Sequence, residues 1–100
     1  MNKGARVVVL ASGSGTNAEA IFSYFKNHPL IDVVLLVCNN PEAQVLKRAQ
    51  KFGIPVRVVN RNEFNDKTYM LELLRSQKVP HLVLAGFLWL IPQYLILAFP

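Results

Sequence analysis

Short uninterrupted runs of apolar residues alternate along the chain with longer segments in which apolar positions recur every three or four residues. Turn residues separate four such runs, and all but the third lack alternating polar positions. That pattern is typical of parallel strands covered on both faces. We therefore expect four strands, over residues 7–11, 33–38, 56–59 and 82–85.

The segments between these runs have the spacing of amphipathic helices. The first is centred on residues 18–25, the second on residues 45–52, where Gly53 ends it, and the third on residues 65–77. Strands that alternate with helices predict right-handed crossovers and an open sheet. The predicted fold class is α/β, a Rossmann-like parallel sheet in the order 3-2-1-4, as one domain over residues 1–100.

The stretch from Leu82 to Phe99 contains no charged residue, and its length of about 18 residues raises the question of a membrane span. Gly86 and Pro92 interrupt it, so we expect no membrane partner. A short helix starting at Pro92 would be apolar nearly all round from Tyr94 to Phe99 and would need cover on several sides. We expect either a C-terminal half beyond this chain or a homo-oligomer to provide that cover.

Composition indicates a folded protein, because 52% of the 100 residues are hydrophobic and 17% are charged. Intrinsic disorder is thereby excluded. One cysteine, Cys38, cannot build a disulfide framework, and no signal peptide is visible, so a cytoplasmic location is predicted. The net charge is +5. The basic cluster of Lys47, Arg48 and Lys51 lies opposite an apolar helix face, so we interpret it as solvated surface and expect no nucleic-acid partner.

The strongest local signal is the glycine-rich turn between the first strand and the first helix. Backbone N–H groups at such a turn are unpaired, and the helix dipole adds positive potential, so a phosphate is the natural ligand. Gly13 and Gly15 permit positive φ and close backbone approach, and Ser14, Thr16 and Asn17 add hydrogen-bonding groups. These five residues are the candidate substrate-binding set.

Several interpretations of this turn compete. A Walker-type P-loop requires Lys followed by Ser or Thr, whereas Thr16-Asn17 follows Gly15. The dinucleotide fingerprint is formally met, but Cys38-Asn39-Asn40 stands where an acidic residue would bind the ribose. A phosphomonoester site remains. The alternative without a ligand is a plain N-cap turn in which Ser14 or Thr16 satisfies the first amides of the helix.

The run from Val7 to Ile21 resembles the opening of the phosphoribosylglycinamide formyltransferase family of purine biosynthesis. Later landmarks follow in the family's order: Cys38-Asn39-Asn40, residues 49–55 and Leu84-Ala85-Gly86-Phe87. The related methionyl-tRNA formyltransferases lack the Ser-Gly-x-Gly-Thr-Asn turn. The resemblance implies formyl transfer from 10-formyltetrahydrofolate to the amine of glycinamide ribonucleotide, in IMP biosynthesis.

Site residues follow from the resemblance. It implies that the substrate phosphate binds at Gly15, Thr16 and Asn17, and that folate contacts the set Lys67, Leu88, Trp89, Leu90 and Ile91. Trp89 is a departure, since many relatives have Arg there. The family's catalytic set, an Asn-x-His-Pro motif and a later Asp, falls beyond Pro100, so no catalytic residue is assigned in this chain. No cluster of residues has metal-ligand spacing.

A second interpretation is a non-catalytic nucleotide- or phosphate-binding module that acts with a partner covering Tyr94 to Phe99. The lack of an acidic residue after the second strand argues against its dinucleotide version. For the transferase interpretation, we expect a β-branched residue in place of Gly15 to abolish substrate binding and to leave the fold intact.

Overall fold

The computed structural model describes residues 5–77, 81–87 and 89–99. Four strands form one parallel sheet in the order β3-β2-β1-β4, which confirms the predicted class and strand order. The strands are β1 (Ala5–Ala11), β2 (Ile31–Cys38), β3 (Val56–Val58) and β4 (His81–Leu84). Compared with the prediction, β3 ends one residue earlier and β4 begins and ends one residue earlier.

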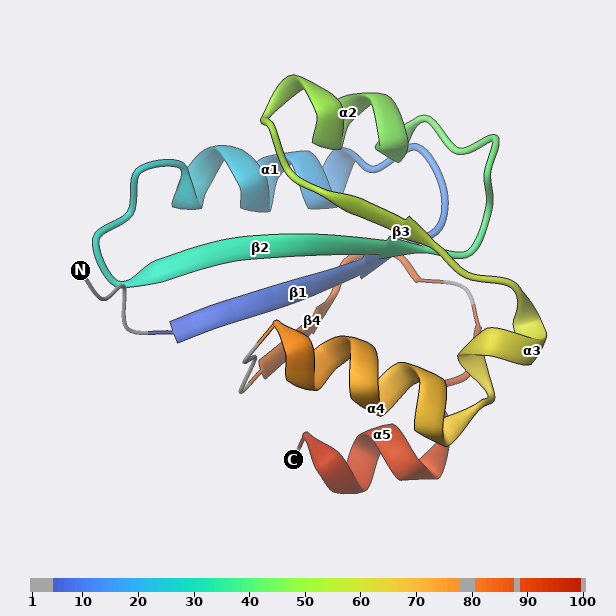
Figure 1. Ribbon diagram of the computed structural model, residues 1–100. Coiled ribbons are helices and arrows are strands. Elements are labelled where there is room, and N and C mark those ends of the chain that lie inside the picture. The colour runs from blue at the N-terminus through green and yellow to red at the C-terminus, as the bar shows by residue number, and fades with distance from the viewer. Residues whose placement is uncertain (1–4, 78–80, 88, 100) are drawn as a thin grey trace.

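Helices cover both faces of the sheet, with α1 and α2 on one side and α4 and α5 on the other (Figure 1). Among the described residues the helices are α1 (Thr16–Phe25), α2 (Val45–Lys51), α3 (Arg61–Phe64), α4 (Lys67–Ser76) and α5 (Gln93–Ala98). None of them is long and apolar enough to cross a bilayer.

The central strand β1 explains the uninterrupted apolar runs. Val8 and Leu10 pack into the core beneath α4 and α5, whereas Val9 and Ala11 pack into the core beneath α1 and α2. All four side chains are buried. A strand between two layers of helices has no solvent face, so no position along it needs to be polar.

The third predicted helix, over residues 65–77, corresponds to α4, and the structure adds the short helix α3 before it, which the sequence did not lead us to expect. The Asn60 side chain accepts a hydrogen bond from the Glu63 amide at 2.7 Å, and the Glu63 carboxylate accepts one from the Asn60 amide at 3.0 Å. This capping box starts α3. Asp66 then caps α4 by accepting from the Tyr69 amide at 3.1 Å. Two N-caps six residues apart stop one continuous helix from forming.

The apolar C-terminal segment is covered on one side among the described residues. Pro92 is the N-cap of α5, as expected, and Leu95 is buried against the core. The Tyr94 hydroxyl donates a hydrogen bond to the Phe64 carbonyl oxygen and so ties α5 to α3. Ile96 and Leu97 remain 55% and 71% exposed. The sequence predicts that α5 is packed on several sides. The described residues pack against only one of them, so the other apolar side chains of α5 stay exposed.

Candidate functional site

A small cavity lies where the loops after β1 and β4 meet. It is lined by residues 13–17, here called the Gly loop, together with Ala85 and Gly86, and its volume is about 90 Å³. Since a water molecule occupies roughly 30 Å³ of liquid, this space suits one compact anionic group better than a whole nucleotide. The strand order reverses between β1 and β4, and ligands of open α/β sheets bind at such a switch point.

Two backbone amides of the residues that line this cavity lack a hydrogen-bond acceptor in the described part of the chain. Among the described residues, the N–H groups of Ser14 and Gly15 have no hydrogen-bond acceptor, and α1 begins directly after them at Thr16. The first turn of a helix adds further unpaired N–H groups and the positive end of its dipole. The backbone of this loop therefore offers hydrogen-bond donors to an anion, and phosphate binding here stays a prediction.

The plain N-cap interpretation is wrong for this loop. Gly15 is the N-cap of α1, and no side chain makes a capping hydrogen bond there. Ser14, Thr16 and Asn17 are exposed, and their side chains form no hydrogen bond within the described part of the chain. Their polar groups are thus available to a ligand.

The structure requires glycine at position 15 but not at position 13. Gly15 has φ 82°, and a Cβ built there would lie 2.4 Å from Val45 Cγ2 and 2.8 Å from Val45 Cα. Gly13 does not adopt positive φ, and a Cβ there would meet nothing within 4 Å. The expectation that a β-branched residue at Gly15 leaves the fold intact is therefore wrong, because both the backbone conformation and Val45 oppose it.

The residues that the resemblance assigns to folate do not share one cavity. Trp89 lines a cavity of about 390 Å³ at the carboxyl ends of β2 and β3, together with Asn39 and Arg61. Leu90 is 93% exposed. Ile91 lines an apolar groove beside β4, and Lys67 lines a groove between α4 and α5. Leu88 lies outside the described residues, so their role in folate binding stays a prediction.

Sequence reasoning missed Arg61 and the aromatic cluster around Trp89. The Arg61 guanidinium lies 4.5 Å from the centre of the Trp89 ring, a cation–π distance. Trp89 also packs against Phe64 and Phe87, with ring centres 5.5 and 6.1 Å away. The capping box Asn60-x-x-Glu63 is a local signal that could have placed Arg61 at a helix start beside the end of β3.

Cys38 ends β2 near this edge of the sheet and is buried. Burial raises the pKa of its thiol and outweighs the backbone hydrogen bonds at Asn40 and Asn39, which lower it. The thiol donates a hydrogen bond to the Asn40 carbonyl oxygen at 3.3 Å. A protonated, inaccessible thiol is not a nucleophile, which confirms its interpretation as a small buried residue. The described residues contain no group of three or more His, Cys, Asp or Glu that could hold a metal ion.

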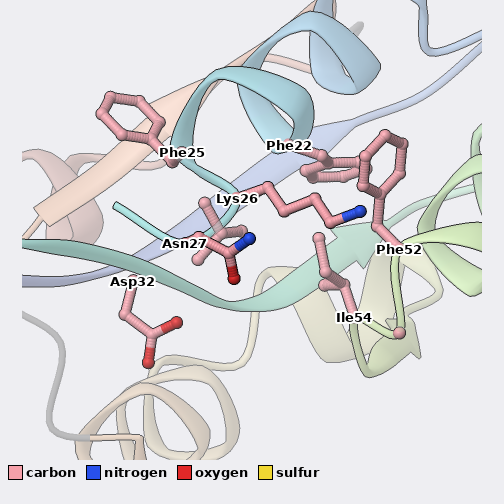
Figure 2. Close-up of a pocket in the computed structure, with 9 residues that line it drawn as sticks. Phe22, Phe25, Lys26, Asn27, Asp32, Phe52 and Ile54 are labelled. Atoms are coloured by element: carbon pink, nitrogen blue, oxygen red, sulfur yellow. The ribbon is translucent and has the colours of Figure 1, made fainter. Parts of the chain in front are cut away.

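A further cavity of about 310 Å³ lies at the opposite end of the sheet, where α1 and α2 end and β2 begins. Figure 2 shows the Lys26 ammonium directed toward Phe52, with Asp32 at the other end of the cavity. This end carries the amino termini of the parallel strands, where ligands of open α/β sheets do not bind. The cavity is therefore separate from the Gly loop.

Comparison with known proteins gives a consistent family. Residues 5–100 match the family model described as formyl transferase. The chain is 34% identical to phosphoribosylglycinamide formyltransferase of Bacillus subtilis over 94% of its own length and 51% of that protein. It is 33% identical to the chicken trifunctional purine biosynthetic protein adenosine-3, covering 83% of this chain and 9% of that one.

Solved structures agree with the sequence comparison. Glycinamide ribonucleotide transformylase 1 from Geobacillus kaustophilus superposes with a TM-score of 0.86 at 33% identity, over 96% of this chain and 54% of that one. Phosphoribosylglycinamide formyltransferase from Anaplasma phagocytophilum gives 0.85 at 36% identity, over 95% and 45%. The chain thus spans about half the length of these single-function relatives.

Proposed function

The chain belongs to the formyl transferase family, and from this premise we propose that it acts in formyl transfer from 10-formyltetrahydrofolate to the amine of glycinamide ribonucleotide. The observation that carries the proposal is the Gly loop, whose free amides lie at the β1/β4 switch point. The names of the relatives support the same substrate, since they are phosphoribosylglycinamide formyltransferases and glycinamide ribonucleotide transformylases.

In this proposal the Gly loop binds the substrate phosphate. The N–H groups of Ser14 and Gly15 donate to phosphate oxygens, and the exposed side chains of Thr16 and Asn17 add polar groups at the start of α1. Charge-assisted hydrogen bonds of this type are about twice as strong as neutral ones. The phosphate is chemically inert in the reaction, so its binding energy serves to position the amine.

The transfer itself needs groups of a different kind. The amine nitrogen attacks the formyl carbon, and an oxyanion forms on the formyl oxygen. A proton is relayed from that nitrogen to N10 of the folate, and the bond between the formyl carbon and N10 then breaks to release tetrahydrofolate. The family resemblance assigns these tasks to an Asn-x-His-Pro motif and an Asp that follow the part of the fold described here. We propose that this chain supplies the phosphate site and one wall of the folate slot.

For the folate wall, we propose the segment from Leu88 to Ile91 together with Lys67. The aromatic cluster supports this proposal on chemical grounds, because Trp89 offers a flat apolar surface beside a cation, Arg61. A pterin is a planar ring system, and planar rings stack on aromatic and guanidinium faces. In this proposal, stacking of the pterin on Trp89 replaces the side-chain contact that an Arg at this position makes in many relatives.

The exposed apolar side chains support a further proposal. Ile96 and Leu97 on α5 and Leu84 on β4 are more than half exposed. We propose that a second half of the protein, or a second copy of the chain, covers them, since such patches on soluble proteins mark interfaces.

A cytoplasmic location is proposed on the basis of the single unpaired cysteine.

The test is a formyl-transfer assay on the full protein that carries this chain, with 10-formyltetrahydrofolate and glycinamide ribonucleotide. We expect turnover with the ribonucleotide and at least a 100-fold lower kcat/KM with the dephosphorylated riboside. No transfer to the ribonucleotide, or equal use of the riboside, would contradict the proposal. Tight binding of a nicotinamide dinucleotide without transfer would instead support the non-catalytic module.

A further inference from the structure

Arg48 connects the Gly loop to the two neighbouring helices. Its Nε donates a hydrogen bond to the Ser14 carbonyl oxygen at 2.5 Å, and its Nη1 pairs with the Glu19 carboxylate. Arg48 belongs to α2 and Glu19 to the first turn of α1. The interpretation of this residue as solvated basic surface is therefore wrong, because its guanidinium is engaged with the loop and with α1.

We propose that Arg48 is a positioning residue for phosphate binding, which holds the Ser14–Gly15 peptide so that the Gly15 N–H faces the cavity. The inference rests on the proposed function, since it gives a role at the site where the substrate phosphate would bind. It is narrower in one respect: it concerns how the loop presents amides to any phosphate and is independent of the formyl transfer.

Peptide geometry sets the direction of the Gly15 N–H. In a trans peptide the C=O and the N–H point in opposite directions, and the described chain contains no cis peptide bond. The Ser14 carbonyl points to Arg48 on α2, so the Gly15 N–H of the same peptide points away from α2. Ala85 and Gly86, which complete the cavity, follow β4 on the other side of β1 from β2 and α2.

A second contact orients the preceding peptide in the same way. The Val45 amide donates to the Gly13 carbonyl oxygen at 3.1 Å, which turns the Ser14 N–H away from α2 as well. Two successive amides are thus directed by α2, one through its backbone and one through the Arg48 side chain. Consecutive N–H groups held in this manner form the anion-binding concavity known as a nest.

Arg48 also offsets an unfavourable charge. Glu19 places a carboxylate within the first turn of α1, where its charge would repel a phosphate bound at the same helix end. Lys51 pairs with the other oxygen of this carboxylate at 2.6 Å. Among the described residues, Lys51 contacts Glu19 and the Phe52 ring and no atom of the Gly loop. Lys51 therefore shares the charge pairing of Arg48 and lacks its contact with the Ser14 carbonyl.

These differences define matched variants for the full protein. Arg48→Gln removes both the positive charge and the planar guanidinium with its several N–H donors. Arg48→Lys keeps the positive charge and removes the planar guanidinium. Lys51→Gln removes one charge from the Glu19 pairing. Lys47→Gln removes one charge from an exposed position on the same helix. Each variant is titrated with inorganic phosphate while the amide signals of Ser14 and Gly15 are followed by NMR, and thermal unfolding shows that each is folded.

We expect Arg48→Gln to weaken phosphate binding at least tenfold and to abolish the phosphate-induced shift of the Gly15 amide signal. Arg48→Lys is expected to lose more than half as much binding free energy for phosphate as Arg48→Gln does, because an ammonium group does not donate in one fixed direction. Lys47→Gln and Lys51→Gln are expected to weaken binding less than threefold. In the transferase assay, Arg48→Gln should raise the KM for the ribonucleotide with kcat changed less than twofold.

The inference is overturned if folded Arg48→Gln and Arg48→Lys bind phosphate as the wild type does, or if Lys47→Gln causes an equal loss. The second result would mean that net charge, and not the orientation of the peptide, sets the affinity. A wild-type protein that binds no phosphate at the loop would also overturn it. If phosphate binding depends on Arg48 but no formyl transfer occurs, the inference stands and the proposed function fails.

Discussion

Replacing Gly15 by alanine is expected to destabilise the protein by about 3 kcal/mol, whereas the same change at Gly13 is expected to be nearly neutral. The φ of 82° at Gly15 costs an L residue about 1–2 kcal/mol. The new Cβ would also overlap Val45, at 2.4 Å from its Cγ2, and overpacking of this kind costs about 1–3 kcal/mol. Neither cost applies at Gly13, where a Cβ enters open space.

The assay is thermal unfolding of the two variants beside the wild type. A loss of about 3 kcal/mol lowers Tm by roughly 12–24 °C in a domain of 60–100 residues and by roughly 6–12 °C in one of 150–250 residues, while Gly13→Ala should stay within about 4 °C. A third variant, Gly15→Ala with Val45→Ala, tests the cause. Removing the Val45 methyl groups should make the double change less destabilising than the sum of the two single changes.

Two results would refute this reasoning. If Gly15→Ala unfolds within a few degrees of the wild type, neither the backbone conformation nor the Val45 contact constrains position 15. If the double variant shows strict additivity, the destabilisation does not arise from the overlap with the Val45 Cγ2 methyl group. In either case the loop would have more freedom than its packing against α2 indicates.

Three further predictions concern stability. Desolvation, with a smaller effect of the Asp66 charge, raises the pKa of Tyr94 to about 12 from 10.0. The contribution of the Tyr94 hydroxyl to the free energy of unfolding is therefore complete below pH 10 and is lost as the pH rises toward 12. Tyr94→Phe should remove this dependence from the profile of unfolding free energy against pH. Pairing with Lys51, and then with Arg48, lowers the pKa of Glu19 from 4.5, so the stability that is present above that pH falls in more acidic solution. Glu19→Gln should remove this pH dependence of the unfolding free energy. The control Glu42→Gln, which alters an exposed carboxyl on the loop before α2, should leave it in place. Asn60→Ala breaks the capping box of α3 and should cost about 1 kcal/mol in urea unfolding, whereas a loss below about 0.3 kcal/mol would show that the cap contributes little.

The sheet was predictable because its information is local. Val8, Leu10, Val9 and Ala11 alternate between two covered faces, so an uninterrupted apolar run was enough to identify β1 as a buried parallel strand. The Gly loop was likewise visible as glycines between a strand and a helix. Those signals need no knowledge of what packs against them.

Contacts between distant parts of the chain were not predictable in the same way. Arg48 and Ser14 are 34 residues apart, and nothing in the spacing of basic residues on α2 distinguishes Arg48 from Lys47. The need for glycine at position 15 arises partly from Val45, which packs against the loop through the tertiary fold. Tyr94 and Phe64 are similarly remote in sequence. The short helix α3, which precedes the predicted helix, differs, since its capping box of Asn60 and Glu63 is a local signal.

The central place of β1 has a consequence for biosynthesis. This strand is synthesised before the other three strands of the sheet, but its neighbour β4 begins only at His81, where Val7 pairs with it. At roughly 5–20 residues per second, the second edge of β1 stays without its partner for about 4–15 s of translation. Ala85 and Gly86, which complete the cavity, emerge later still. A nascent chain stalled before β4 would therefore expose an apolar strand edge to chaperones or to aggregation, and its Gly loop would lack the residues that complete the cavity.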